Sequence, residues 1–319
     1  MKKISSNIKA FFSAPVAKET LGVFRIGVAS FALLQLLILL PDWMSFYGPD
    51  GFLNWTITDT LSTKHTPDLS NVANLFSALS NQQTLYVVTA LYLLSLLGLV
   101  AGFKTRLCAF TAWLMHTILN STGHFIAYGV ETFTHIALFY CMVLPVGCCY
   151  SFDALSKTFR KPAAHLITLS VRLIQLHLCI MYFSCGIEKS LGTQWWNGEA
   201  IWIALQQDQF HQINVGWMAQ LPIIPRLAGW LTLAVETLYP LCIFFAKTKR
   251  LWLVSIIAMH LSIALFLGLH LFGSIMIILN ITAFGDHAFK GIFGYARNAK
   301  KRSTNNWIAS GILSLQHIE

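Results

Sequence analysis

Charged side chains are scarce in this sequence. Asp, Glu, Lys and Arg make up 11% of the 319 residues, whereas a soluble globular domain carries about 25%. So few charges cannot cover a surface that faces water. Hydrophobic residues account for 55% of the chain, and the mean hydropathy is +0.61. These values exclude an ordinary soluble domain and indicate a protein that crosses a membrane.

Acidic residues are the scarcer charge, with 13 Asp and Glu against 22 Lys and Arg. In a soluble protein the net charge of +9 would suggest a nucleic-acid partner. In a membrane protein it instead reflects Lys and Arg gathered in cytoplasmic loops, and no nucleic acid is expected. The segment Met1 to Ala17 is basic but lacks a small-residue cleavage site. We therefore expect the apolar run Leu21 to Leu40 to be retained as a helix.

The sequence contains no Cys-x-x-Cys pair, and its seven cysteines lie within apolar runs or at their ends. This placement argues against a disulfide framework and a zinc site, and no metal is expected. Cys148 and Cys149 lie at a helix end, which favours palmitoylation or simple packing over redox catalysis. Cys185 is one turn from Lys189, so a direct role for this thiol stays open.

Apolar runs of near bilayer length recur along the chain and predict an all-α polytopic membrane bundle of about eight transmembrane helices. The last two runs share one continuous apolar stretch, and we place the turn between Gly268 and Gly273. The predicted spans are 20–40, 83–102, 107–121, 131–147, 165–187, 227–246, 250–267 and 271–285.

Lys and Arg are distributed unevenly between the predicted loops. One side holds almost all of them, and the other holds Lys64, Lys189 and Arg226 with most of the acidic residues. This bias places both termini in the cytoplasm and the loops 41–82 and 188–226 on the exoplasmic side of the cell (cytoplasmic or inner) membrane. Residues 1–286 then form one transmembrane domain, and 287–319 form a basic cytoplasmic tail.

Several ionisable residues fall inside the predicted spans. Each is costly to bury without a partner, so each is expected to pair or to line a wet cavity. For Glu236 the expected partners on a neighbouring helix are His260, Arg25 and Arg172, in that order. A structural bond within the bundle and a proton route or quinone contact both stay open. The set comprises Arg25, Arg172, His177, Glu236 and His260.

Lys189 and His124 interrupt apolar sequence at the same predicted membrane face. Lys189 lies where the span 165–187 ends, so it is either an interfacial anchor or a working group. A desolvated lysine has a lowered pKa and can act as a base near neutral pH, and a nearby histidine could assist it. Glu188, the adjacent residue, would favour the charged ammonium and oppose this effect.

The two exoplasmic loops are long enough to carry function. In the second, Trp195 and Trp196 fit either an interfacial aromatic belt or the lining of a site. Residues 199–210 predict a short amphipathic helix with Ile201, Ala204 and Leu205 on one side.

Several motifs between Leu21 and Phe210 resemble the transmembrane region of vitamin K-dependent gamma-glutamyl carboxylases. The chain is more specifically similar to the bacterial horizontally transferred transmembrane (HTTM) family that shares this region. No single motif is decisive, and their shared order and spacing carry the resemblance. The motifs are Leu21-Gly22-Val23-Phe24-Arg25, Gly102-Phe103-Lys104-Thr105-Arg106-Leu107, His124 with Tyr128-Gly129, Tyr182-Phe183 with Gly186-Ile187-Glu188-Lys189, and Trp195 or Trp196 with Gly198 and Leu205.

The resemblance implies a specific chemistry. The lysine at the place of Lys189 would deprotonate a vitamin K-type hydroquinone or menaquinol, and the histidine at the place of His124 would help the later steps. Oxygen then turns the quinol into a strong base that removes a glutamate proton before carbon dioxide adds. Candidate residues for the pocket that holds this cofactor are Tyr128, Tyr182, Trp195, Trp196 and His177.

This chain also departs from the carboxylases. About 34 residues follow the last predicted span in this sequence, so we expect it to hold no counterpart of their large lumenal domain. Glu188 stands where vertebrate enzymes have a second lysine. Its size is similar to small membrane factors that mature exported peptide toxins, such as those for the sporulation-delaying peptide. We therefore expect a quinol-dependent enzyme acting on an exported peptide, with an accessory subunit for peptide recognition. The alternative is a non-enzymatic chaperone or export factor that retains the scaffold, and a solute transporter fits less well because no inverted repeat is visible.

Overall fold

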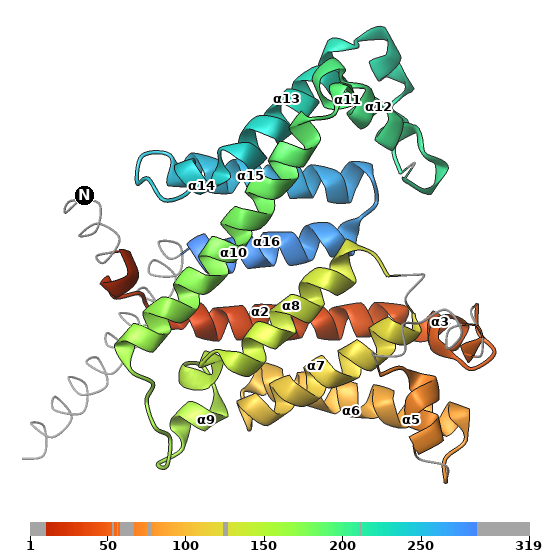
Figure 1. Cartoon of the computed structure of the whole chain (residues 1–319), viewed down its shortest axis with the longest axis vertical. Coiled ribbons are helices and arrows are strands. Elements are labelled where there is room, and N and C mark those ends of the chain that lie inside the picture. The colour runs from red at the N-terminus through yellow and green to blue at the C-terminus, as the bar shows by residue number, and fades with distance from the viewer. Residues whose placement is uncertain are drawn as a thin grey trace, which may run out of the picture. The chain divides into compact units, whose positions relative to one another are not determined.

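The computed structural model describes residues 11–52, 54–55, 57, 67–75, 78–123, 127–210 and 212–285. The chain divides into two units, Met1–Phe284 and Gly285–Glu319. Apart from Gly285, the second unit lies outside the described residues, and so does the predicted cytoplasmic tail. Within the first unit the described residues form helices joined by turns and contain no strand (Figure 1).

Every predicted span contains a helix. The longer helices are α2 (Glu19–Leu39), α6 (Asn81–Ala101), α7 (Thr105–Thr122), α8 (Gly129–Val143), α10 (Ala164–Ser190), α13 (Ile223–Thr237), α15 (Lys249–Phe266) and α16 (His270–Phe284). The shorter ones are α3 (Trp43–Tyr47), α5 (Leu69–Leu75), α9 (Phe152–Leu155), α11 (Thr193–Asn197), α12 (Glu199–Gln206) and α14 (Tyr239–Cys242).

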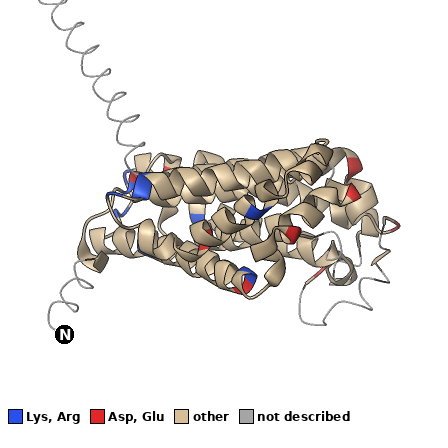
Figure 2. Ribbon diagram, turned by 90° about the horizontal axis from the view of Figure 1, so that it is seen from above, with Lys and Arg blue, Asp and Glu red and all other residues tan. Residues whose placement is uncertain are grey.

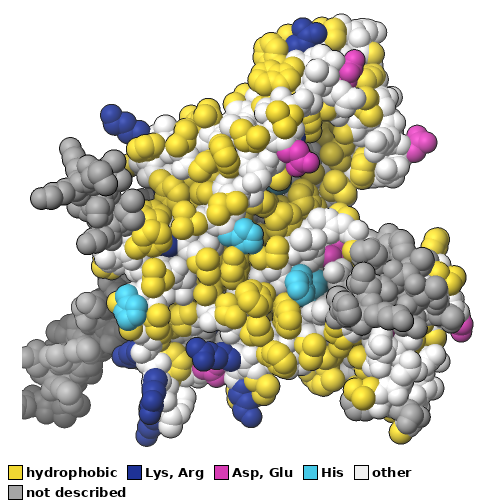
Figure 3. Space-filling view, in the orientation of Figure 1, with side chains coloured by type: hydrophobic (Ala, Val, Ile, Leu, Met, Phe, Trp, Pro, Cys, Tyr) yellow, Lys and Arg dark blue, Asp and Glu magenta, His cyan; other side chains and the backbone are white. Residues whose placement is uncertain are grey.

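Among the described residues, four helical segments are long and apolar enough to cross a membrane: Glu19–Tyr47, Asn81–Ala101, Ala164–Ser190 and Lys249–Phe266. Two shorter apolar helices, α8 and α16, accompany them. Large hydrophobic side chains remain exposed on these helices, including Leu94, Ile180 and Leu251, and Figure 3 shows such side chains over much of the visible face. Because water does not favour so much exposed apolar surface, the helices indicate a membrane protein.

Helix α2 lies at the centre of the bundle. It packs against α6 and α8 on one side and against α16 on another (Figure 1). Its inward residues Leu21, Phe24 and Val28 are fully or almost fully buried. The pairs α6–α7, α7–α8, α15–α16 and α10–α13 complete the main contacts. The long helix α10 therefore joins the centre of the bundle to α11, α12 and α13.

Two predicted boundaries are wrong in detail. The span 227–246 is not one helix: α13 ends at Thr237, and α14 begins at Tyr239. Pro240 accounts for the break, because proline has no N–H to donate and its ring clashes with the preceding turn. The turn between the last two helices covers 267–269 rather than a point between Gly268 and Gly273. Gly268 has φ +68° there, and Gly273 lies inside α16.

Charges are separated along the bundle. Figure 2 shows Asp and Glu mainly toward one end and Lys and Arg mainly toward the other, with a few charges of each sign between them. The loop helices α11 and α12 lie beyond the end of α10 that carries Lys189 (Figure 1). The predicted helix at 199–210 is present as α12, followed by a single 3-10 turn at Asp208–Phe210.

Candidate functional site

Lys189 and Glu236 form a close ion pair between two helices. Lys189 lies in the last turn of α10, and Glu236 is the penultimate residue of α13. Lys189 Nζ donates to Glu236 Oε1 at 2.8 Å and to Oε2 at 2.6 Å. The Lys189 side chain is 26% exposed and that of Glu236 only 6%. The pair therefore combines a buried carboxylate with a partly exposed lysine side chain.

Gly186 allows the two helices to approach closely enough for this pair. A Cβ atom at Gly186 would lie 2.5 Å from Thr237 Oγ1 and 2.7 Å from Thr237 N. Such contacts are too short for any side chain, so only glycine fits where α10 meets the end of α13. Because Gly186 and Lys189 are three residues apart, they share one face of α10. The glycine thus brings Lys189 over Glu236.

An aromatic ring covers the ammonium group. Lys189 Nζ lies 5.4 Å from the centroid of the Trp195 ring. Trp195 belongs to α11, which is tied to the end of α10 because Trp196 Nε1 donates to Ser190 O at 2.8 Å. The two tryptophans that the sequence left open thus differ. Trp195 contacts the Lys189 ammonium, whereas the Trp196 ring is 52% exposed.

A buried hydrogen-bonded network lies around Tyr182, two turns before Lys189 on α10. Tyr182 OH is 2.8 Å from His260 Nε2 and accepts from Asn280 Nδ2 at 2.7 Å. Tyr239 OH donates to Asn280 Oδ1 at 2.6 Å. All four side chains are at most 2% exposed. The network joins α10, which carries Lys189, to α14, α15 and α16.

The partner predicted for Glu236 is wrong. His260 bonds to Tyr182, and Arg25 and Arg172 bond elsewhere, so Lys189 is the partner instead. The prediction assumed that consecutive antiparallel helices align their midpoints. Glu236 instead lies near the end of α13, because that helix begins at Ile223 and stops before Pro240. Helix α10, which is distant in sequence, is the neighbour it meets.

Arg25 and Arg172 bind backbone atoms. Arg25 is fully buried, and its guanidinium donates to the carbonyl oxygens of Leu99, Val100 (2.8 Å) and Tyr150 (2.5 Å). Leu99 and Val100 lie in the last turn of α6, so Arg25 links the end of that helix to the segment around Tyr150. Arg172 Nε donates to Phe11 O at 3.1 Å, and the guanidinium lies 4.2 Å from the Phe11 ring centroid. Both arginines therefore hold segments of the chain in place.

The remaining predicted site residues lie apart or outside the described part. His177 is twelve residues before Lys189 on α10, about 18 Å along the axis, and its Nδ1 is 2.5 Å from Tyr140 OH. Tyr128 is 41% exposed at the start of α8. His124 lies outside the described residues. The predicted pairing of Lys189 with His124 therefore stays a prediction.

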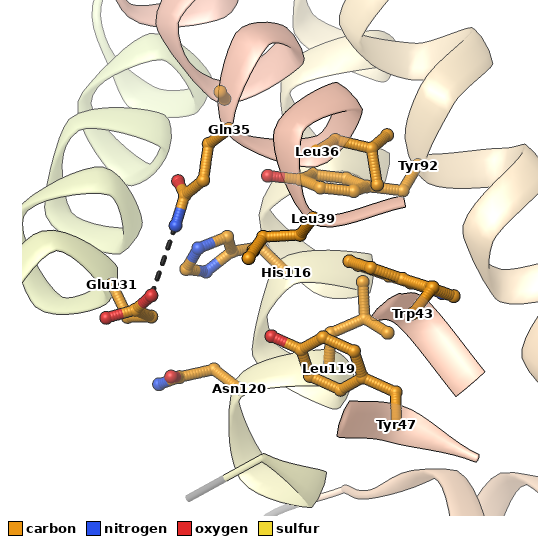
Figure 4. Close-up of a pocket in the computed structure, with 11 residues that line it drawn as sticks. Gln35, Leu36, Leu39, Trp43, Tyr47, Tyr92, His116, Leu119, Asn120 and Glu131 are labelled. Atoms are coloured by element: carbon orange, nitrogen blue, oxygen red, sulfur yellow. Dashed lines mark hydrogen bonds between the residues drawn. The ribbon is translucent and has the colours of Figure 1, made fainter. Parts of the chain in front are cut away.

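A second polar cluster was not predicted from the sequence. Gln35, His116, Asn120 and Glu131 line a cavity of about 20 Å³ between α2, α7 and α8 (Figure 4). Gln35 Nε2 donates to Glu131 Oε1 at 3.1 Å, and the backbone N of Tyr128 donates to Oε2 at 2.8 Å. His116 Nδ1 and Asn120 Oδ1 are buried and have no hydrogen-bond partner. A cavity of this size can hold one water molecule.

Among the described residues, no group of three or more His, Cys, Asp or Glu side chains could hold a metal ion. The seven cysteines are all free. The described part of the chain contains four cavities, and Lys189 lines none of these four. No protein-family model matches the chain, and comparison with curated proteins and with solved structures likewise finds no match.

Proposed function

We propose that this is a multi-pass membrane protein in which the Lys189–Glu236 pair transfers a proton during quinol-dependent modification of an exported peptide. The proposal includes about eight spans, cytoplasmic termini and an inner-membrane location. The separation of charges along the bundle supports this orientation. The observation that carries the function is the ion pair, whose ammonium is partly exposed while its carboxylate is buried.

The donor groups at Lys189 fit a hydroquinone-type cofactor, either vitamin K-type or menaquinol. An ammonium group has three N–H donors, and two are directed at Glu236. The third can hold a hydroxyl oxygen, and the Trp195 ring beside it offers a flat apolar surface. When bound, the cofactor would supply an acidic hydroxyl group and reducing electrons.

The pair, rather than lysine alone, acts as the base. A charged ammonium cannot accept a proton, but Lys189 Nζ can release one to the Glu236 carboxylate as it takes one up from a bound acidic group. The net change is that Glu236 becomes neutral while Lys189 stays positive. The ammonium then faces the negative charge left on the acid, which stabilises that charge in a site of low dielectric. Glu188, which the sequence placed beside the base, is exposed, whereas Glu236 contacts the ammonium directly.

This function can be tested by analysing the peptides that cells producing the protein export. We expect mass spectrometry of the secreted fraction to detect a modified peptide with the wild type and at least about 100-fold less of it with Lys189→Met or Glu236→Gln, since acid–base groups contribute at least that factor. Glu188→Gln is the matched control, because it removes a neighbouring exposed carboxylate and should leave the modification unchanged. Membrane levels of each variant establish that the protein is still inserted.

The alternative function is an export factor without chemistry, and the bracing of α10 against α13 by the ion pair favours it as the second candidate. In that case the secreted peptide would have its unmodified mass with the wild type, and the variants would change only its amount. That outcome would overturn the enzymatic proposal.

A further inference from the structure

A large groove lies at the opposite end of α10 from Lys189. Its volume is about 1140 Å³, and it is lined by the start of α7, the end of α8, the segment before α10 and the first turns of α10. This volume exceeds that of most small-molecule pockets. The groove is therefore large enough for an extended ligand.

One end of the groove is strongly basic. Lys104, Arg106, Arg160 and Lys161 line it, and all four are exposed. None forms a salt bridge within the described part of the chain. The one acidic lining residue, Asp153, is already engaged by the backbone N–H groups of Lys104 and Thr105. In Figure 3 the Lys and Arg side chains gather along the edge where Figure 1 places α9 and the beginning of α10.

The start of α10 adds to this positive field. Its N-cap is Ala163, no side chain caps the first turn, and that turn contains no acidic residue. The unsatisfied N–H groups of a helix N-terminus carry a partial positive charge that favours anions. Together with the four cations, they make this end of the groove suited to a phosphate group.

The rest of the groove is apolar. Leu166, Leu169 and Leu173 follow one face of α10, and Leu107 and Val143 stand opposite on α7 and α8. These five side chains are between 44% and 59% exposed. From Leu166 to Leu173 the stripe extends about 10 Å along the helix axis. The groove thus has a cationic head and an apolar body aligned with a membrane-spanning helix.

We propose that this groove binds one anionic phospholipid, with its phosphate held by the basic end and its acyl chains along α10. Charge complementarity selects an anionic headgroup over a zwitterionic one. Basic pockets between transmembrane helices are suited to such lipids, and each Lys or Arg close to the headgroup contributes about fivefold in affinity. Scattered surface cations would attract anionic lipids in bulk but would not fix one molecule in a groove.

Native mass spectrometry of the delipidated full-length protein tests the proposal. The probes are dioleoylphosphatidylglycerol and dioleoylphosphatidylcholine, which share acyl chains and differ in headgroup charge. We expect the anionic lipid to occupy one site at least about tenfold more tightly than the zwitterionic lipid. Lys161→Gln should weaken that site about fivefold. Lys157→Gln is the matched control, because Lys157 is exposed in the same segment but does not line the groove, and it should have no effect.

Two further experiments distinguish a bound lipid from a bound phosphate ion. Leu169→Trp fills the apolar body and should lower the affinity for phosphatidylglycerol, whereas Ile180→Trp, on the exposed face of α10 outside the groove, should not. Inorganic phosphate at equal concentration should not displace the lipid. The proposal is overturned if Lys157→Gln and Lys161→Gln act alike, if Leu169→Trp has no effect, or if phosphate competes fully.

Discussion

Lys189 Nζ lies 2.8 and 2.6 Å from the two carboxylate oxygens of Glu236, a residue 47 positions later in the chain. The contact joins the end of α10 to the end of α13, and each side chain supplies the counter-charge of the other. It gives Lys189 a buried partner to which a proton can pass, and it braces two helices. The two roles lead to different predictions.

Removing one partner of the pair should destabilise the protein unequally. Lys189→Met leaves the Glu236 charge, only 6% exposed, without a partner, and we expect a cost of about 3–5 kcal/mol. Glu236→Gln should cost less, because the Lys189 ammonium is partly exposed and can be solvated. The double variant should be more stable than the sum of the two single changes predicts. Thermal unfolding of the three variants in detergent measures this coupling, and strictly additive effects would show that the pair contributes nothing.

Replacement of Gly186 should disturb the pair without changing any charge. In Gly186→Ala the new methyl group meets the Thr237 backbone, and overpacking of this kind costs about 1–3 kcal/mol. Gly192→Ala is the matched control, because a Cβ there has its nearest contact at 3.4 Å, with Trp195. Equal unfolding temperatures for the two variants would contradict the close approach of α10 and α13.

Low pH should weaken the hydrogen bonds that join Asp153 to the backbone at the start of α7. Partial burial raises the pKa of this carboxyl, but hydrogen bonds from Thr105 and from the Lys104 backbone outweigh it and hold the pKa below its ordinary value. A lowered pKa stabilises the fold above the unfolded value of about 3.9, and this contribution is lost as the pH falls through the folded pKa.

Hydrogen exchange at the Lys104 and Thr105 amides, corrected for intrinsic rates, should therefore accelerate below about pH 4. In Asp153→Asn it should already be fast at neutral pH and independent of pH. Asp208→Asn, an exposed acidic residue of another loop, serves as the control and should behave as the wild type. Unchanged protection in Asp153→Asn would remove the carboxylate from this role.

Long apolar runs made the positions of the helices predictable. Each of the eight runs contains a helix, because a long apolar segment that leaves water satisfies its backbone N–H and C=O groups most simply by helical hydrogen bonds. The break at Leu238 was missed, although Pro240 signals it, because hydropathy alone does not register a missing N–H.

Neighbours in space were harder to predict than helices. The sequence shows that Glu236 needs a partner but not which helix supplies it, so His260 was chosen over Lys189. Tyr239 and Asn280 were missed for the same reason, although Asn280 stands out as an amide within the apolar segment 275–284. The four polar residues Gln35, His116, Asn120 and Glu131 come from three helices, and no spacing in the sequence links them.

Orientation in the membrane can be tested with single cysteines at exposed positions. The distribution of Lys and Arg predicts that Gln207→Cys reacts with a membrane-impermeant maleimide in intact cells and that Lys157→Cys reacts only after lysis. Both positions are exposed, one after α12 and the other after α9. The parent protein gives the background labelling of its native cysteines. The reverse pattern would invert the proposed topology.

The central claim is that Lys189 moves a proton rather than merely bracing α10. Lys189→Arg tests it most directly, because guanidinium also pairs with a carboxylate but does not release a proton near neutral pH. The measurement is the amount of modified peptide exported by producing cells, with the unfolding temperature of the purified variant recorded beside it. The account predicts an unfolding temperature close to that of the wild type and no modified peptide. Modified peptide at the wild-type level would contradict it and leave Lys189 as a structural residue.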